Sequence, residues 1–72
     1  MKPIGIRGEF ITLGQFLKFA GIAETGGDAR AMLDDGEVQV NGDSENRRGR
    51  KLYPDDVVVV FGDEFVVTRE DR

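Results

Sequence analysis

The chain contains no cysteine and no histidine, and these absences exclude several kinds of site. Without cysteine there is no disulfide, no thiolate nucleophile and no zinc site built from thiolates. Without histidine the commonest general base and the commonest transition-metal ligand are missing. Ser44, the three threonines and Tyr53 fall into no arrangement of nucleophile and base. We therefore expect a protein that is not an enzyme, holds no cofactor or metal, and takes no small-molecule substrate.

Long apolar runs are absent as well. No stretch reaches the roughly 18 residues of a membrane span, and Met1-Lys2-Pro3 leads into no signal-peptide core. Leu, Ile, Val and Phe nevertheless make up 21 of the 72 residues, more than the roughly 20% below which a charged chain is expected to be disordered. We expect one folded domain over residues 1–72, cytoplasmic and without a membrane partner, with residues 70–72 frayed.

The positive charge is concentrated in one segment. The net charge is −4, and residues 1–46 and 52–72 each carry −4, so Arg47-Arg48-Gly49-Arg50-Lys51 places four positive charges in five residues. We call this segment the basic loop. The guanidinium group of an arginine can donate two parallel hydrogen bonds to the oxygens of a phosphate. A compact basic segment on an acidic chain indicates a localised anionic partner. The alternative is a solvated loop that only balances nearby carboxylates.

Two short helices are predicted in the first half of the chain. Thr12, with Gln15 three residues later, has the pattern of a capping box, and Gly21 is suited to end that helix. Thr25 caps a second helix that ends at Gly36. Residues at helical spacing would form the buried stripes, namely Leu13, Phe16, Leu17 and Ala20 in the first helix and Ala29, Met32 and Leu33 in the second.

The second half predicts strands. Glu37–Val40 alternates, Asn41-Gly42 is a strong hairpin signal, and the return arm has no apolar residue up to Lys51, so we expect an exposed arm that runs into a solvated loop. On that basis, reversing the charges of Arg47 and Arg50 should leave folding intact. A second hairpin is predicted to turn at Gly62-Asp63 in a type II′ turn, with Ile4–Arg7 as a further strand. Core aromatic residues are expected to be Phe10, Phe16, Phe61 and Phe65.

The start of the second helix is a further candidate for anion binding. Gly26 and Gly27 lie in its first turn, where backbone amides lack partners and the helix dipole favours an anion, and Arg30 follows on the same face. Alternatively the glycines only allow close packing while Arg30 pairs with Asp34. Tyr53 could stack on a base or form a wall between core and loop.

The order of these motifs resembles a known family. Leu13-Gly14-Gln15-Phe16-Leu17-Lys18, Thr25-Gly26-Gly27-Asp28-Ala29-Arg30, Gly36-Glu37-Val38-Gln39-Val40-Asn41-Gly42 and the basic loop followed by Leu52 are similar to the RNA-binding domain first described in the small-subunit ribosomal protein "S-four", also called the alpha-L motif. The similarity spans roughly residues 9–60, and more narrowly the chain is similar to bacterial stand-alone members, which consist of little beyond this one domain. One departure is Pro54-Asp55-Asp56, where relatives often have Pro-Gly-Asp.

The resemblance implies an α+β fold, in which two short helices pack on a small, mainly antiparallel sheet. It also implies a non-catalytic module that binds structured RNA, with ribosomal RNA or the ribosome as the expected partner, and we expect a monomer. Carried over position by position, the expected RNA contacts are Thr25, Gly26, Gly27, Arg30, Asn41, Gly42, Arg47, Arg48, Arg50 and Lys51, with Lys18 as a weaker candidate. The alternative function is a protein-interaction module that docks on a basic ribosomal or enzyme surface.

Overall fold

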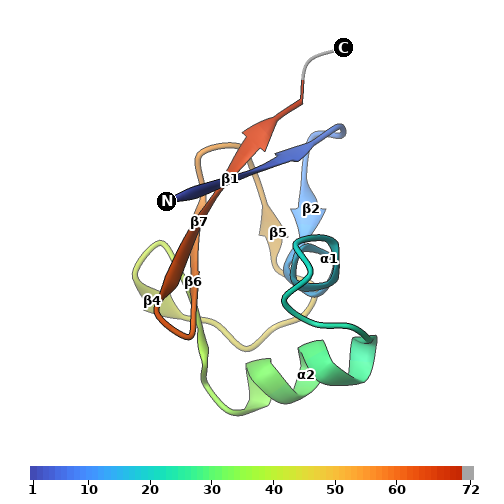
Figure 1. Cartoon of the computed structure of the whole chain (residues 1–72), viewed down its shortest axis with the longest axis vertical. Helices are drawn as coiled ribbons and strands as arrows, with labels where there is room; N and C mark the ends of the chain where they lie inside the picture. Colours follow the sequence, from blue (N-terminus) through green and yellow to red (C-terminus); the bar gives the residue numbers. More distant parts are fainter. Residues whose placement is uncertain (71–72) are drawn as a thin grey trace.

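The computed structural model describes residues 1–70 and contains two helices and seven strands (Figure 1). In chain order the elements are β1 (Lys2–Ile6), β2 (Ile11–Thr12), α1 (Leu13–Phe19), α2 (Gly26–Asp34), β3 (Val38–Val40), β4 (Asp43–Ser44), β5 (Lys51–Leu52), β6 (Val57–Val60) and β7 (Asp63–Arg69). Five strands form one sheet in the order β1-β7-β6-β3-β4, while β2 and β5 form a separate ribbon. Only the β1–β7 pair is parallel. The predicted α+β class is confirmed.

The two helices begin and end where the sequence predicts. Thr12 Oγ1 accepts a hydrogen bond from the Gln15 amide at 3.3 Å, and the Gln15 side chain accepts one from the Thr12 amide at 3.2 Å, which completes the capping box. Thr25 caps α2 through its hydroxyl alone, which accepts from the Asp28 amide at 3.1 Å. Gly21 and Gly36 follow the two helices with φ angles of 77° and 76°, a conformation that glycine adopts without strain.

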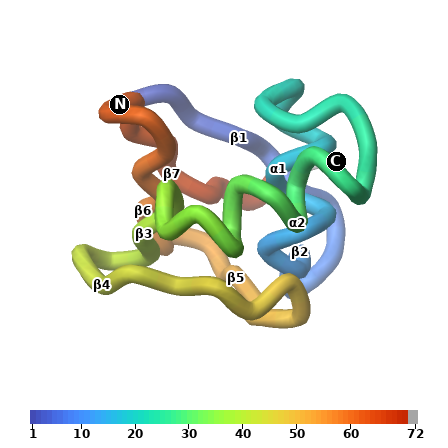
Figure 2. Tube along the Cα trace, turned by 90° about the horizontal axis from the view of Figure 1, so that it is seen from below, coloured from blue at the N-terminus to red at the C-terminus, as the bar shows by residue number. Residues whose placement is uncertain are grey.

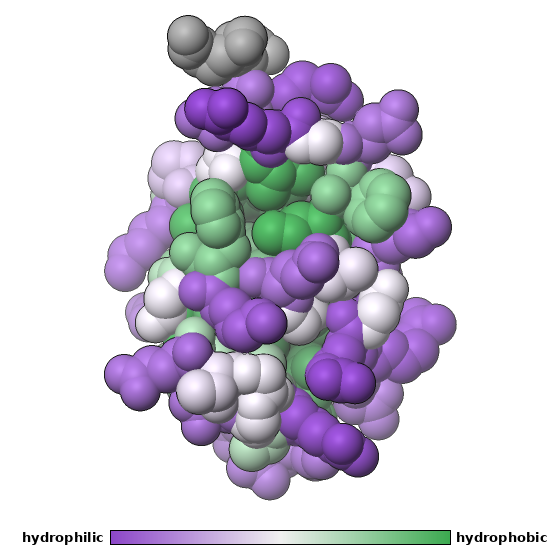
Figure 3. All heavy atoms as spheres, turned by 90° about the vertical axis from the view of Figure 1, so that its right-hand side faces the viewer, coloured by the Kyte–Doolittle hydropathy of each residue, from purple (hydrophilic) through white to green (hydrophobic). Residues whose placement is uncertain are grey.

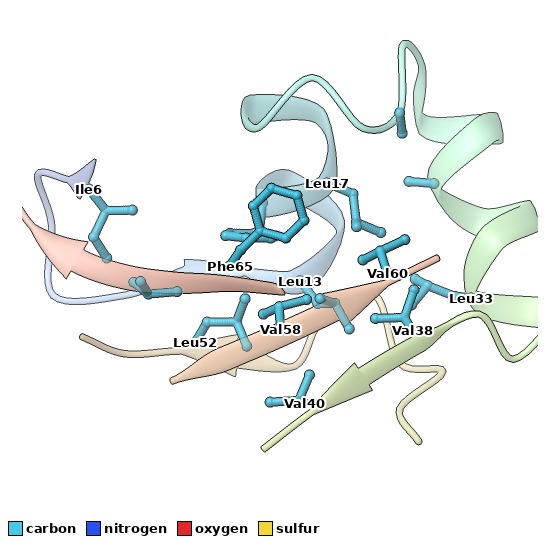
Figure 4. Close-up of a cluster of buried hydrophobic side chains, with 14 residues drawn as sticks. Ile6, Leu13, Leu17, Leu33, Val38, Val40, Leu52, Val58, Val60 and Phe65 are labelled. Carbon is cyan, nitrogen blue, oxygen red and sulfur yellow. The ribbon is translucent and has the colours of Figure 1, made fainter. Parts of the chain in front are cut away.

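One hydrophobic core lies between the helices and the sheet (Figure 4). Alternation along β3 and β6 turns Val38, Val40, Val58 and Val60 into this core. The ring of Phe65 meets that of Phe16 edge to face, with 6.0 Å between centroids. The other large side chains that are fully buried are those of Leu13, Leu17, Leu33, Leu52 and Val67. The predicted inner faces of both helices therefore pack as expected, and they hold α1 and α2 against the sheet.

The first hairpin forms as predicted. Asn41 and Gly42 have φ angles of 52° and 90°, as a two-residue type I′ turn requires, and they join β3 to β4. Asn41 also ties this turn to the next one, because its side chain donates to Asp56 at 3.1 Å and accepts from the Val57 amide at 2.9 Å.

The turn predicted for the second hairpin is wrong. The two central residues are Phe61 and Gly62, with φ angles of 51° and 83°, and Val60 pairs with Asp63. A turn at Gly62-Asp63 would point the same strand faces inward, so burial does not choose between the two registers. The choice is made at the far end of the hairpin, where Val67 exchanges backbone hydrogen bonds with Asp55 and Asp56.

Two of the four aromatic residues expected in the core lie at the surface. Phe61 is 62% exposed because it forms the turn, and Phe10 is also exposed, immediately before β2. Alternation from the inward-pointing Val58 and Val60 places Phe61 outward in either register. Phe16 and Phe65 are buried, as predicted.

We expect Phe61→Asn to stabilise the protein. A bulky residue in the left-handed region costs about 1–2 kcal/mol, whereas asparagine tolerates it and Asn-Gly is the preferred type I′ pair. The free energy of unfolding in urea should rise by about 1 kcal/mol, with Phe61→Leu as the control that keeps the strain. A Phe61→Asn variant no more stable than Phe61→Leu would contradict this explanation.

The end of the described chain is held in place. The Glu70 amide donates to the Ile6 carbonyl at 2.7 Å, and the Glu70 carboxylate pairs with Arg7 at 3.3 Å. Glu70 is therefore not frayed, and the expected fraying of Asp71 and Arg72 lies outside the described residues. Neither helix of residues 1–70 has the length and apolar character needed to cross a membrane.

Candidate functional site

The basic loop is attached by its backbone to the start of α1. The Leu13 amide donates to the Arg50 carbonyl at 2.8 Å, and the Gly14 amide donates to the Arg48 carbonyl at 3.0 Å. Amides in the first turn of a helix have no partner within the helix, so the loop carbonyls satisfy them. Figure 2 shows the chain running from β4 past α2 to this point. The attachment fixes where the cationic side chains leave the backbone.

A buried carboxylate holds two of the arginines. Glu45 Oε2 accepts from Arg47 Nε at 2.9 Å and from the Arg47 amide at 3.1 Å, while Oε1 accepts from Arg47 at 3.1 Å and from Arg50 at 2.8 Å. The side chain of Glu45 is only 8% exposed, against 70% for Arg47 and 31% for Arg50. The expectation of a purely solvated loop is therefore wrong. Reversing the charges of Arg47 and Arg50 would set two carboxylates against buried Glu45 and disturb folding.

The two guanidinium groups change the acidity of this cluster. Hydrogen bonds from Arg47 and then Arg50 hold the pKa of Glu45 far below its usual range, against the opposing effect of burial. The hydrogen bond to Glu45 and its charge raise the pKa of Arg47. Glu45 is therefore charged at neutral and mildly acidic pH, and both arginines keep their partner there.

This shift predicts how stability depends on pH. Since the pKa of Glu45 is lower in the folded than in the unfolded chain, its contribution is complete above the ordinary value of about 4.3 and is lost as the pH falls towards the folded value. Wild type should exceed Glu45→Gln in unfolding free energy by a constant margin above about pH 6, and the margin should shrink steadily below about pH 5. Urea denaturation at a series of pH values measures it, and a margin that does not change with pH would contradict the ion-pair assignment.

A cationic cleft of about 260 Å³ opens between α1, α2 and the basic loop. The residues that line it include Thr12, Gln15, Lys18, Gly26, Arg48 and Gly49, and no carboxylate is among its lining residues. Within residues 1–70, Arg48 has no hydrogen-bonding or ion-pairing partner for its guanidinium. The cleft thus brings Lys18 and Arg48 to the amino end of α2, and neither side chain makes an ion pair among residues 1–70.

The amino end of α2 adds backbone donors to the cleft. Thr25 satisfies the third and fourth amides of this end, because its hydroxyl accepts from Asp28 at 3.1 Å and its carbonyl accepts from Ala29 at 3.1 Å. Gly26 and Gly27 donate to no group within the described part of the chain. Two amides and the positive end of the helix dipole therefore remain available to an anion.

The other predicted contact residues lie around the cleft or away from it. Arg30 is exposed on α2, with Nε 4.0 Å from Asp34, too far for a hydrogen bond. Lys51 extends from β5, with its ammonium 4.8 Å from the centroid of the Phe10 ring. Asn41 and Gly42 form the β3–β4 turn, and the Asn41 side chain is used there for internal hydrogen bonds.

Sequence reasoning undervalued two residues. Lys18 was the weaker candidate, yet it lines the cleft with Arg48. Lys18 lies in the last turn of α1, four residues after Gly14, and residues i and i+4 share a helix face. This spacing indicates that Lys18 and Gly14 lie on the same side of the helix. Glu45 lies in the return arm that was predicted to be exposed, and no local pattern marks it as buried.

The comparisons with known proteins agree with this architecture. The chain forms a small α+β domain in which a basic loop is fixed by its backbone to the first of two helices. Residues 4–68 match the family model described as "S4 domain", so the chain belongs to the S4 domain family. The chain is also 55% identical, over 61 residues, to the probable ribosome maturation protein RlbA of Bacillus subtilis (strain 168). The aligned segment covers 85% of this chain and 86% of that protein.

Proposed function

We propose that the protein is a non-catalytic module that binds structured RNA through the cationic cleft and the basic loop. The observation that carries the proposal is the cleft itself, in which Lys18, Arg48 and the amino end of α2 at Gly26 meet and no carboxylate is among the lining residues. Phosphate is the anion that suits this set of donors, because arginine binds its oxygens in a fork and helix amides point at it directly.

The surrounding cationic side chains would contact further phosphates of the RNA backbone on either side of the cleft. Arg30 on α2, and Arg47 and Lys51 of the basic loop, are exposed and would extend the positive surface beyond the cleft. Glu45 restrains Arg47 and Arg50 and so lowers the conformational entropy lost when they meet phosphates. Since double-stranded RNA offers its sequence poorly to side chains, recognition would rest on backbone and shape. In this proposal Thr25, Asn41 and Gly42 support the surface by holding α2 and the β3–β4 turn.

Ribosomal RNA is the proposed partner. The name of the Bacillus subtilis relative assigns that protein a probable role in ribosome maturation, and the identity over most of both chains supports an RNA-binding role linked to ribosome biogenesis here. The protein would act in the cytoplasm, as a monomer, on ribosomal RNA or on a ribosomal particle. Crosslinking in cells, followed by sequencing of the attached nucleic acid, tests this partner. Recovery of protein partners that persist after nuclease treatment, and no RNA, would instead favour docking on a basic protein surface.

We expect binding to structured RNA to weaken as salt increases. If about three to five phosphates are neutralised, log affinity plotted against log salt should have a slope of roughly −2 to −4. Fluorescence anisotropy of a labelled RNA hairpin at several salt concentrations measures the slope. A flat response would mean that the basic loop contacts no phosphate.

A further inference from the structure

Two aromatic rings and an ammonium gather on the β2–β5 ribbon, outside the cationic cleft. Phe10 immediately precedes β2, Lys51 begins β5, and Tyr53 follows β5. The rings of Phe10 and Tyr53 lie 6.0 Å apart at an interplanar angle of 50°, and Lys51 Nζ lies 4.8 Å from the centroid of the Phe10 ring. We call these three side chains the aromatic cluster.

The cluster is exposed, and its backbone is fixed. Phe10 is 40% and Tyr53 47% exposed, so much of their ring surface is not used in the core. Tyr53 is held by its amide, which donates to Asp56 Oδ2 at 2.8 Å, and Lys51 is held by its pairing with Thr12. Rigid aromatic surface that faces solvent suits a planar ligand, because few degrees of freedom are lost when the ligand stacks on it.

The cluster also continues the cationic surface. Lys51 is the last residue of the basic loop, and Tyr53 lies three residues beyond Arg50, about 10 Å along an extended chain. A stacked nucleic-acid strand advances about 3.4 Å per nucleotide. An RNA strand whose phosphates contact the basic loop would therefore reach Tyr53 within about three nucleotides of those phosphates.

The neighbouring surface is mainly apolar. Phe10 also lines a hollow of about 320 Å³ together with Ile6, Ile11 and Phe19, and the two charged residues of its lining, Arg7 and Glu70, pair with each other. Figure 3 shows apolar residues gathered in the upper part of this face, bordered by polar ones. Such surroundings suit the flat face of a base and do not suit a phosphate, which divides the surface into a phosphate-binding part and an apolar part.

We propose that the aromatic cluster, chiefly Tyr53, is a stacking surface for an unpaired RNA base next to the helical segment held by the cleft. The proposal rests on the RNA-binding function above and adds the kind of RNA that is bound, namely a helix interrupted by an unpaired nucleotide. Lys51 covers Phe10 and leaves Tyr53 to meet the base, in the way that single-stranded RNA is commonly recognised.

The test compares two RNA hairpins that differ at one nucleotide. One carries a single unpaired adenosine in its stem, and the other has an abasic site at the same position. Tyr53 is the only tyrosine of the chain, so tyrosine-labelled protein gives NMR ring signals from this residue alone. These signals should move upfield with the adenosine hairpin and stay in place with the abasic one.

Variants of Tyr53 measure how much stacking contributes to the affinity for RNA. Tyr53→Leu, which keeps an apolar contact with Phe10, should bind the adenosine hairpin about 5- to 150-fold more weakly and the abasic hairpin as wild type does. Tyr53→Phe should bind like wild type. Phe61→Leu, which alters an exposed ring at the β6–β7 turn, is the matched control and should change neither affinity.

The outcomes separate this inference from the proposed function. One contrary result is salt-dependent binding of both hairpins while the Tyr53 ring signals do not move, and another is the same loss of affinity for both RNAs in Tyr53→Leu. Either result overturns the stacking surface and leaves RNA binding intact. Binding to neither hairpin overturns both proposals. If Tyr53→Leu does not fold, the ring signals of the wild-type protein decide the question alone.

Discussion

Replacing both Lys18 and Arg48 by glutamine is expected to weaken binding of a structured RNA hairpin by at least about 100-fold. Each side chain would lose a charge-assisted contact worth about 1.5–3 kcal/mol. The slope of log affinity against log salt should become shallower by about 2, one for each lost phosphate contact. Folding should be preserved, because Arg48 is exposed and the hydrogen bond from Gly14 uses its backbone carbonyl.

The matched control removes the same charge elsewhere. Lys2→Gln with Arg69→Gln neutralises two exposed cations on the β1–β7 pair, so both double variants have the same net charge. Anisotropy titrations at fixed and varied salt should separate the two. Equal losses of affinity would show that only net charge matters and would remove the cleft from the proposed interface.

Glu45→Ala is expected to destabilise the folded protein by about 2 kcal/mol at neutral pH. The carboxylate makes four hydrogen bonds with Arg47 and Arg50 while almost fully buried. Bonds to charged groups contribute about 1.5–3 kcal/mol, and the stranded arginines remain partly solvated, which keeps the loss below that of a fully buried pair. A domain of this length has only roughly 4–11 kcal/mol of stability in total, so the midpoint of urea denaturation should fall clearly.

Asp43→Ala supplies the comparison within the same arm. Asp43 is exposed in β4, and its removal should alter the free energy of unfolding by no more than about 0.5 kcal/mol. Glu45→Gln should lie between wild type and Glu45→Ala, since its amide oxygen still accepts from an arginine. Should Glu45→Ala be as stable as Asp43→Ala, the ion-pair cluster would not be a determinant of loop structure.

Local signals in the sequence were sufficient for most of the elements. Thr12 and Thr25 act on amides three residues away, and Asn41-Gly42 sets its own turn, so each of these features could be recognised without knowing the rest of the fold. The apolar stripes of both helices depend on a period of 3.6 residues, which is equally local. The motif order that resembles the S4 domain rests on these same segments, and the match over residues 4–68 confirms it.

Two features that the sequence predicted wrongly depend on contacts between residues that are far apart in the chain. The Phe61-Gly62 turn was missed because the register of that hairpin is fixed at Val67 by the turn after Pro54, about 15 Å away along the strands. Burial of Glu45 was missed because an arm without apolar residues predicts exposure, and only the arginines beyond it make burial of a carboxylate tolerable.

The sequence alone determined the composition of the candidate interface, because a cluster of four cations and a glycine-rich helix start are visible in the order of residues. Tertiary structure decided which of these groups act together. The first turn of α1 uses the carbonyls of Arg48 and Arg50 as hydrogen-bond acceptors, and this places Arg48 beside Lys18 and Gly26 while Glu45 takes Arg47 and Arg50. Such a division depends on backbone groups far apart in the chain, which satisfy one another only once the helix and the loop have packed.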